Sequence, residues 1–83
     1  MEVTAGQVEV RYLESGVDRL VFVFNHGKQA TQATVSLQMP PGTFWATDVS
    51  AGTAVPLVRM GQKIRFETRL EADGVQVLRL RPR

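Results

Sequence analysis

Short strand-like stretches, most of them with alternating apolar and polar residues, run the length of this chain, and turn residues separate them about every ten positions. They lie at residues 8–12, 19–25, 33–38, 43–49, 53–60, 63–70 and 74–80. A period of two is typical of a β-strand with one buried face, and no segment has the 3.6-residue period of an amphipathic helix. The pattern predicts an all-β fold: residues 1–83 form a single antiparallel β-sandwich of about seven short strands, immunoglobulin-like or Greek-key.

The size and composition of the chain allow one domain with a thin core. The chain has 83 residues, of which 43% are hydrophobic and 22% charged, values typical of a globular protein. A domain of this size buries only about 60–65% of the surface that its unfolded chain exposes, so a neighbouring surface would stabilise it. The formal net charge of +2 is too small to create a polyanion-binding field, and the absence of cysteine excludes disulfides and thiolate metal ligands.

The N-terminus carries no targeting pattern. Its first six residues, Met-Glu-Val-Thr-Ala-Gly, lack the basic region and apolar stretch of a signal peptide. No apolar run approaches the ~18 residues that a membrane-spanning helix needs, so no membrane partner is expected. Strand-like sequence begins almost directly after Met1, which fits a segment cut from inside a longer protein.

One predicted strand has apolar side chains on both faces. Residues 19–25 read Arg-Leu-Val-Phe-Val-Phe-Asn, which predicts a central strand or one covered on both sides. Phe44 and Trp45 are neighbours on another strand, so they should point to opposite faces of it. Something is therefore expected to cover the outer side of this sheet. The rest of a parent chain, a symmetry mate and a sugar stacked on Trp45 all fit.

The last two strands are predicted to form a hairpin. Residues 63–70 alternate cleanly, and Ala72-Asp73-Gly74 suits a three-residue loop whose glycine adopts the left-handed conformation. In the register that this loop sets, Phe66 lies opposite Leu80 and Glu67 lies opposite Arg79.

Basic residues would share the outer face of that hairpin. They are Lys63, Arg65, Arg69, Arg79 and Arg81. We interpret them as a solvated face or as a docking face for acidic groups of a neighbouring domain. Glu67 and Glu71 interrupt the set and no aromatic residue lies within it, so nucleic acid is not an expected partner.

The sequence offers no catalytic equipment. His26 is the only histidine and lies in a turn, so it provides neither a nucleophile–base pair nor a metal site. Glycosidase chemistry needs two carboxylates about 5–10 Å apart across a cleft, for which Asp48, Glu67 and Glu71 are the candidates. Glu67 and Glu71 alternate with arginines and are interpreted as ion-pair partners. We expect no catalytic residue, no metal and no cofactor.

Aromatic residues are the remaining candidates for binding. Trp45, Phe44 and Tyr12 could contact another domain or provide a platform for a pyranose ring, because an aromatic ring presents a flat apolar face to a sugar.

Three motifs resemble the small C-terminal β domain of family 42 β-galactosidases and related glycosidases. Residues 21–26, Val-Phe-Val-Phe-Asn-His, resemble that family's strand ending in Phe-x-x-Asn-His. Residues 48–55, Asp-Val-Ser-Ala-Gly-Thr-Ala-Val, resemble its acidic turn after the fourth strand. Residues 73–80, Asp-Gly-Val-Gln-Val-Leu-Arg-Leu, are similar to its closing strand, which runs Gly-Val-x-Val-Leu. The likeness covers residues 7–81.

The resemblance implies a non-catalytic accessory domain of a glycoside hydrolase. In that family the catalytic carboxylates lie in a barrel domain of the same chain, so no catalytic residue transfers to this segment. The implied partners are that catalytic domain and, through oligomerisation, further copies of the chain. Two alternatives stay open: a free-standing carbohydrate-binding module that uses Trp45 or Tyr12, and a protein-interaction β module.

Overall fold

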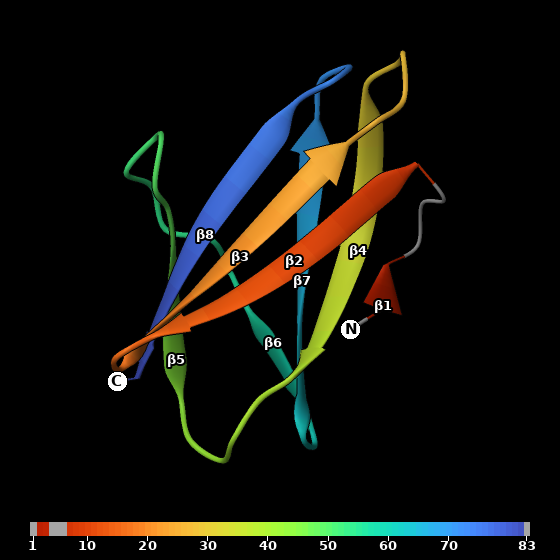
Figure 1. Cartoon of the computed structure of the whole chain (residues 1–83). Coiled ribbons are helices and arrows are strands. Elements are labelled where there is room, and N and C mark those ends of the chain that lie inside the picture. Colours follow the sequence, from red (N-terminus) through yellow and green to blue (C-terminus); the bar gives the residue numbers. More distant parts are fainter. Residues whose placement is uncertain (1, 4–6, 83) are drawn as a thin grey trace.

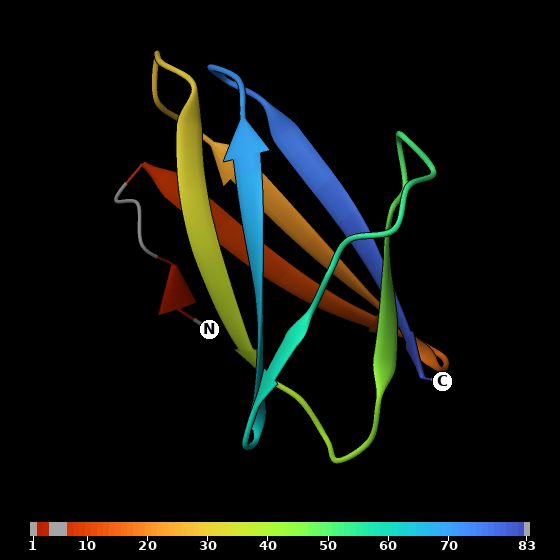
Figure 2. The same ribbon diagram turned by 180° about the vertical axis from the view of Figure 1, so that it is seen from behind.

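The computed structural model describes residues 2–3 and 7–82, and every strand pair in it is antiparallel (Figure 1). Its strands are β1 (Glu2–Val3), β2 (Val8–Ser15), β3 (Asp18–Asn25), β4 (Thr31–Gln38), β5 (Phe44–Asp48), β6 (Val58–Met60), β7 (Lys63–Leu70) and β8 (Val75–Pro82). They form two four-stranded sheets, β1-β4-β7-β6 and β2-β3-β8-β5. The sheets face each other in both views (Figures 1 and 2), which confirms the predicted all-β sandwich.

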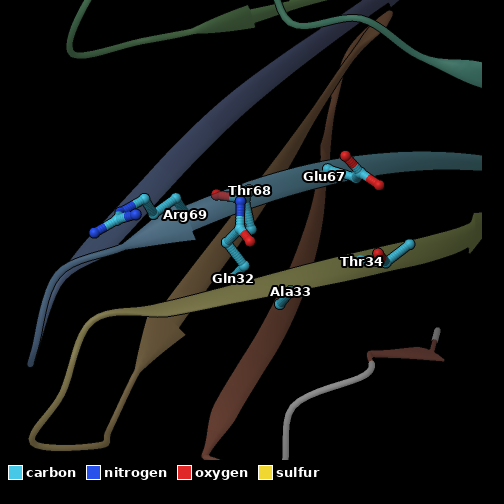
Figure 3. Close-up of a pocket in the computed structure, with 6 residues that line it drawn as sticks. All are labelled: Gln32, Ala33, Thr34, Glu67, Thr68 and Arg69. Carbon is cyan, nitrogen blue, oxygen red and sulfur yellow. The ribbon is translucent and has the colours of Figure 1, made fainter.

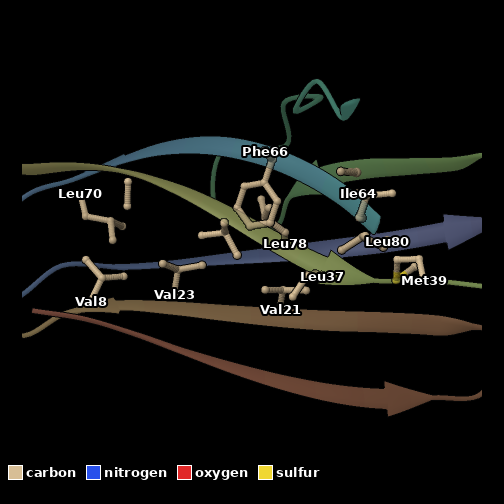
Figure 4. Close-up of a cluster of buried hydrophobic side chains, with 13 residues drawn as sticks. Val8, Val21, Val23, Leu37, Met39, Ile64, Phe66, Leu70, Leu78 and Leu80 are labelled. Carbon is tan, nitrogen blue, oxygen red and sulfur yellow. The ribbon is translucent and has the colours of Figure 1, made fainter. Parts of the chain in front are cut away.

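The core fills the space between the two sheets (Figure 4). The period-two alternation places one side of each long strand inward, as expected. Val21 and Val23 of β3 and Leu78 and Leu80 of β8 are fully buried, and Phe66 of β7 is only 2% exposed. The core residues are Val8, Val21, Val23, Ala33, Val35, Leu37, Met39, Ala46, Ile64, Phe66, Leu70, Leu78 and Leu80.

Two short hairpins join strands that are neighbours in the sequence. Ser15 pairs with Asp18, so β2 and β3 are linked by a two-residue turn in which Gly16 has a φ of 62°. Met60 pairs with Lys63, and Gly61 in the turn between them has a φ of 63°. A left-handed residue at this position is typical of the tight turns that match the twist of paired strands.

The predicted hairpin between residues 63–70 and 74–80 is wrong. β7 pairs with β4 and β6, whereas β8 pairs with β3 and β5, so the chain crosses from one sheet to the other between them. Alternation specifies which side chains point inward, but two strands with the same pattern can lie side by side or face each other across the core. Phe66 and Leu80 therefore belong to the same core cluster from opposite sheets.

The crossing loop also uses its residues differently from the prediction. Asp73 has the positive φ of 55°, and Gly74 is outside the left-handed region. Gly74 is required for close approach instead, because a Cβ atom there would lie 2.8 Å from the carbonyl oxygen of Glu71. The Gly74 amide donates a hydrogen bond to that same oxygen at 2.9 Å.

The strand order differs from that of an immunoglobulin constant domain. In that fold the last strand lies at the edge of its sheet, but β8 lies between β3 and β5. The strand predicted at residues 53–60 is shorter than expected. Only β6 pairs as a strand, and the part before Pro56 contributes a single bridge between Thr47 and Ala54.

No helix in the described part of the chain is long and apolar enough to cross a membrane.

Candidate functional site

The outer face of the β2-β3-β8-β5 sheet carries large apolar side chains. Val21 and Val23 point into the core and are 0% exposed, so the alternating residues of β3 point outward. The strand register aligns them with outward residues of β2 and β8. The set, which we call the apolar face, is Leu13, Leu20, Phe22, Phe24, Val75 and Val77. This confirms the predicted two-sided strand.

An aromatic ladder lies along β3 on the apolar face. The rings of Phe22 and Phe24 are stacked, with centroids 6.4 Å apart and an interplanar angle of 10°. His26 extends the ladder, with its ring 6.0 Å from that of Phe24 at the same angle. The rings cover one another only partly, since Phe22 and Phe24 remain half-buried rather than buried.

Charged groups close one end of the apolar face. Glu9 lies opposite Phe24 in the register, and its carboxylate is 2.8 Å from His26 Nε2 and 2.7 Å from Arg11 Nε. The hydrogen bond to His26, followed by that to Arg11, lowers the pKa of Glu9 below its ordinary value. Arg11 projects farthest into solvent in this group, with 70% of its side chain exposed.

A second charged group lies at the opposite end, around Asp18. Arg81 donates to both carboxylate oxygens of Asp18, from Nε at 3.0 Å and from Nη2 at 3.3 Å. Arg79 Nε lies 4.0 Å from the same carboxylate. Trp45 lies opposite Arg81 in the β5–β8 register and is 54% exposed. The ion-paired groups around the apolar face are the guanidinium groups of three arginines and the carboxylates of two acids, so this rim has an excess of positive charge. They are Arg11, Arg79, Arg81, Glu9 and Asp18.

The aromatic candidates do not form one platform. Trp45 is on the outer face, while Phe44 packs against the core with the Arg19 guanidinium carbon 5.6 Å from its ring centroid. These two neighbours therefore point to opposite faces, as expected. Tyr12 also packs against the core, and its hydroxyl donates to Glu14 at 3.3 Å. Burial raises the pKa of Tyr12. Trp45 alone remains a candidate sugar platform.

The predicted basic face does not exist as one surface. Lys63, Arg65 and Arg69 are on the outer face of β7, while Arg79 and Arg81 are on β8 in the other sheet. Opposite Glu67 in the register lies Thr34 rather than Arg79, and opposite Arg65 lie Ser36 and Val58 rather than Arg81.

The outer face of the β1-β4-β7-β6 sheet is polar over β4 and β7, whereas its edge strand β6 exposes Val58 and Met60 there. Figure 3 shows a depression there between β4 and β7. Its lining residues are Gln32, Ala33, Thr34, Glu67, Thr68 and Arg69. The outward residues of β4 and β7 are amides, hydroxyls and charges, so these two central strands differ sharply in polarity from β3 and β8 of the other sheet.

Asn25 has a structural role that sequence reasoning missed. It is 1% exposed, and its Nδ2 donates to the carbonyl oxygens of Gln29 at 2.9 Å and Glu71 at 3.0 Å. Its Oδ1 accepts a hydrogen bond from the Gly27 amide at 2.9 Å. Asn25 thus fastens the end of β3 to the following turn and to the loop that crosses between sheets. Its burial could have been predicted from the sequence, because Asn25 lies on the same side of β3 as Val21 and Val23.

Asp48, a hypothetical catalytic carboxylate, also has a structural role. Its Oδ1 accepts from the amides of Ser50 at 2.9 Å and Ala51 at 3.0 Å, and its Oδ2 accepts from Gln76 Nε2 at 2.9 Å. The Gln76 side-chain oxygen accepts in turn from the Thr68 hydroxyl. This chain of hydrogen bonds connects β5, β8 and β7, so it joins the two sheets. The hydrogen bond from Gln76, followed by that from Ala51, lowers the pKa of Asp48.

No metal centre is present in residues 2–3 and 7–82, where no group of three or more His, Cys, Asp or Glu residues could hold an ion.

A scan against protein-family models, a search of curated proteins and a search of solved structures each found no match for this chain. The likeness to glycosidase C-terminal domains therefore rests on the sequence motifs, and the parent enzyme is a matter for proposal.

We predict that Asn25→Ala lowers the free energy of unfolding by about 2–3 kcal/mol, because it leaves the Gly27 amide without its acceptor and takes one of two hydrogen bonds from each of the Gln29 and Glu71 carbonyls. Urea denaturation measures this change. Thr31→Ala is the matched control, since the Thr31 hydroxyl donates to the same Gln29 carbonyl from a less buried position. The control should stay within about 0.5 kcal/mol of wild type. An equally small effect at Asn25 would contradict the assigned role.

Stability should fall in acid through Asp48. Because its pKa in the folded state lies below the ordinary 3.8, folding favours the charged form. That contribution is fully present above the unfolded pKa and is lost as the pH falls through the folded pKa. In urea titrations from pH 7 to pH 2, Asp48→Asn should be less stable at pH 7 and lose less stability below pH 4 than wild type. An Asp48→Asn slope as steep as wild type would contradict the assignment.

Proposed function

We propose that this chain is a non-catalytic accessory domain of a glycoside hydrolase of β-galactosidase type, packed through its apolar face against the catalytic barrel of the parent chain. The apolar face is the observation that carries the docking part of the proposal. The glycosidase part is supported by the sequence motifs at residues 21–26, 48–55 and 73–80.

The energetics favour a covered apolar face. Contiguous apolar patches on the surface of a soluble domain commonly mark interaction sites. Leu13 and Val75 are 52% and 54% exposed, and the stacked phenylalanines between their strands are half-buried. Burying a phenylalanine fully is worth about 1.5–3 kcal/mol. An 83-residue domain has a thin core, so a covering surface would contribute a large share of its stability.

The charges around the apolar face indicate how the partner surface is built. Arg11, Arg79 and Arg81 remain partly exposed at 70%, 45% and 59% of their side chains. Charged groups at the rim of an interface mainly set orientation and exclude wrong partners. The partner surface would therefore be apolar at its centre and acidic at the points that face these three arginines.

Trp45 supports a second candidate function, a carbohydrate-binding module. Its side chain is on the outer face of an edge strand, opposite Arg81 and near the Asp18 carboxylate, so hydrogen-bonding groups lie beside an exposed indole. Titration with a panel of oligosaccharides should change the Trp45 fluorescence if a sugar stacks there. An unchanged spectrum removes this function.

We predict that the isolated chain binds a hydrophobic dye such as ANS through the apolar face. The double substitution Phe22→Ser/Phe24→Ser should abolish most of the fluorescence enhancement, because it removes the aromatic ladder while both Val21 and Val23 remain in the core. Far-ultraviolet circular dichroism checks that the fold is kept.

The matched control for this experiment is Val58→Ser. Val58 is 48% exposed but lies on the outer face of the other sheet, so the variant should bind dye as wild type does. A wild-type chain that binds no dye, or a loss of binding in the control alone, would contradict docking through the apolar face.

A further inference from the structure

β2 is an eight-residue edge strand whose outer side pairs with no other strand in the described residues. Its sequence, Val-Glu-Val-Arg-Tyr-Leu-Glu-Ser, contains neither the proline nor the lysine that commonly protects such edges, and its register with β3 runs without a bulge. An unprotected edge of this length is a template for pairing with another strand.

The hydrogen-bond pattern of β2 shows which backbone groups face outward. The His26 amide donates to the Gln7 carbonyl at 2.8 Å, so Gln7 and His26 form a hydrogen-bonded pair. In an antiparallel ladder such pairs alternate, so Glu9 and Arg11 also bond to β3. The backbone N–H and C=O groups of Val8, Val10 and Tyr12 therefore point to the open edge.

We propose that a second copy of this chain pairs there, β2 to β2 and antiparallel, about a two-fold axis at Val10. Val10 then lies opposite Val10 of the partner subunit, and Val8 lies opposite Tyr12 of the partner subunit. In each of these pairs, both residues have N–H and C=O groups that point outward from the edge, so about six backbone hydrogen bonds form between the two β2 strands. The two β2-β3-β8-β5 sheets become one continuous sheet.

Charge complementarity selects this register. With the axis at Val10, Glu9 lies opposite Arg11 of the partner subunit, and by symmetry the pair occurs twice. An axis at Glu9 or at Arg11 would place like charges directly opposite each other, which is destabilising. An axis at Tyr12 would place Val10 opposite Glu14 of the partner subunit and leave Arg11 opposite a leucine.

This dimer goes beyond the proposed accessory function and does not depend on it. It uses a sheet edge, whereas the proposed docking uses the apolar face. Substitutions at Val10 and at the two phenylalanines therefore separate the two ideas.

Sedimentation velocity of the chain at micromolar to millimolar concentration tests the dimer. Wild type should show a concentration-dependent monomer–dimer equilibrium. Val10→Pro removes two of the backbone hydrogen bonds at the axis and should weaken dimerisation about tenfold or more. The fold should survive, because proline is tolerated where an edge N–H faces solvent. Val10→Thr keeps the N–H and the branched shape, so it should dimerise like wild type.

A charge-reversal series tests the register, including the case in which Val10→Pro fails to fold. Glu9→Arg and Arg11→Glu should each weaken dimerisation, and the double variant should restore it, because only the sign of each cross-strand pair is exchanged. A strictly monomeric wild type overturns the proposal. So do single reversals without effect, a folded Val10→Pro variant that still dimerises, and a dimer lost only in Phe22→Ser/Phe24→Ser.

Discussion

The central strand β3 carries apolar side chains on both of its faces, and a two-layer sandwich can bury only one of them. Val21 and Val23 fill the core, so Phe22 and Phe24 are left on the outside. The rings stack on each other and on His26, which reduces their exposure without removing it. Arginines lie around this apolar face, and on the opposite sheet the outward residues of β4 and β7 are polar.

Motif residues that suggested a glycosidase family are used here to hold the two sheets together. Asn25 connects the end of β3 to the loop between β7 and β8. Asp48 closes the turn after β5 and reaches Thr68 of the other sheet through Gln76. Gly74 allows close approach to Glu71. These contacts explain how the ends of the strands and the loops of the sandwich are held together.

Much of the fold was predictable because alternation identifies strands and their inward faces. It correctly predicted strands at residues 63–70 and 74–80, whose Phe66 and Leu80 lie in the core, and it predicted that Phe44 and Trp45 point to opposite faces. It could not assign partners to β7 and β8, since the same pattern suits a hairpin and a crossing between sheets. Because the two strands were predicted to pair, Arg65 and Arg81 were also predicted to share one basic face. The hydrogen bonds from Asn25 to Glu71 and from Gln76 to Asp48 span 46 and 28 residues of sequence, which no local pattern encodes.

The most direct test of the accessory-domain account is the length and content of the native reading frame that encodes this segment. The account predicts several hundred residues of alternating strand and helix upstream of Met1, as a catalytic barrel would require. A native frame that begins at Met1 and encodes only these residues would contradict it, because the apolar face would then have no catalytic domain to cover it. A free-standing binding module would become the better explanation of Trp45 and its charged neighbours.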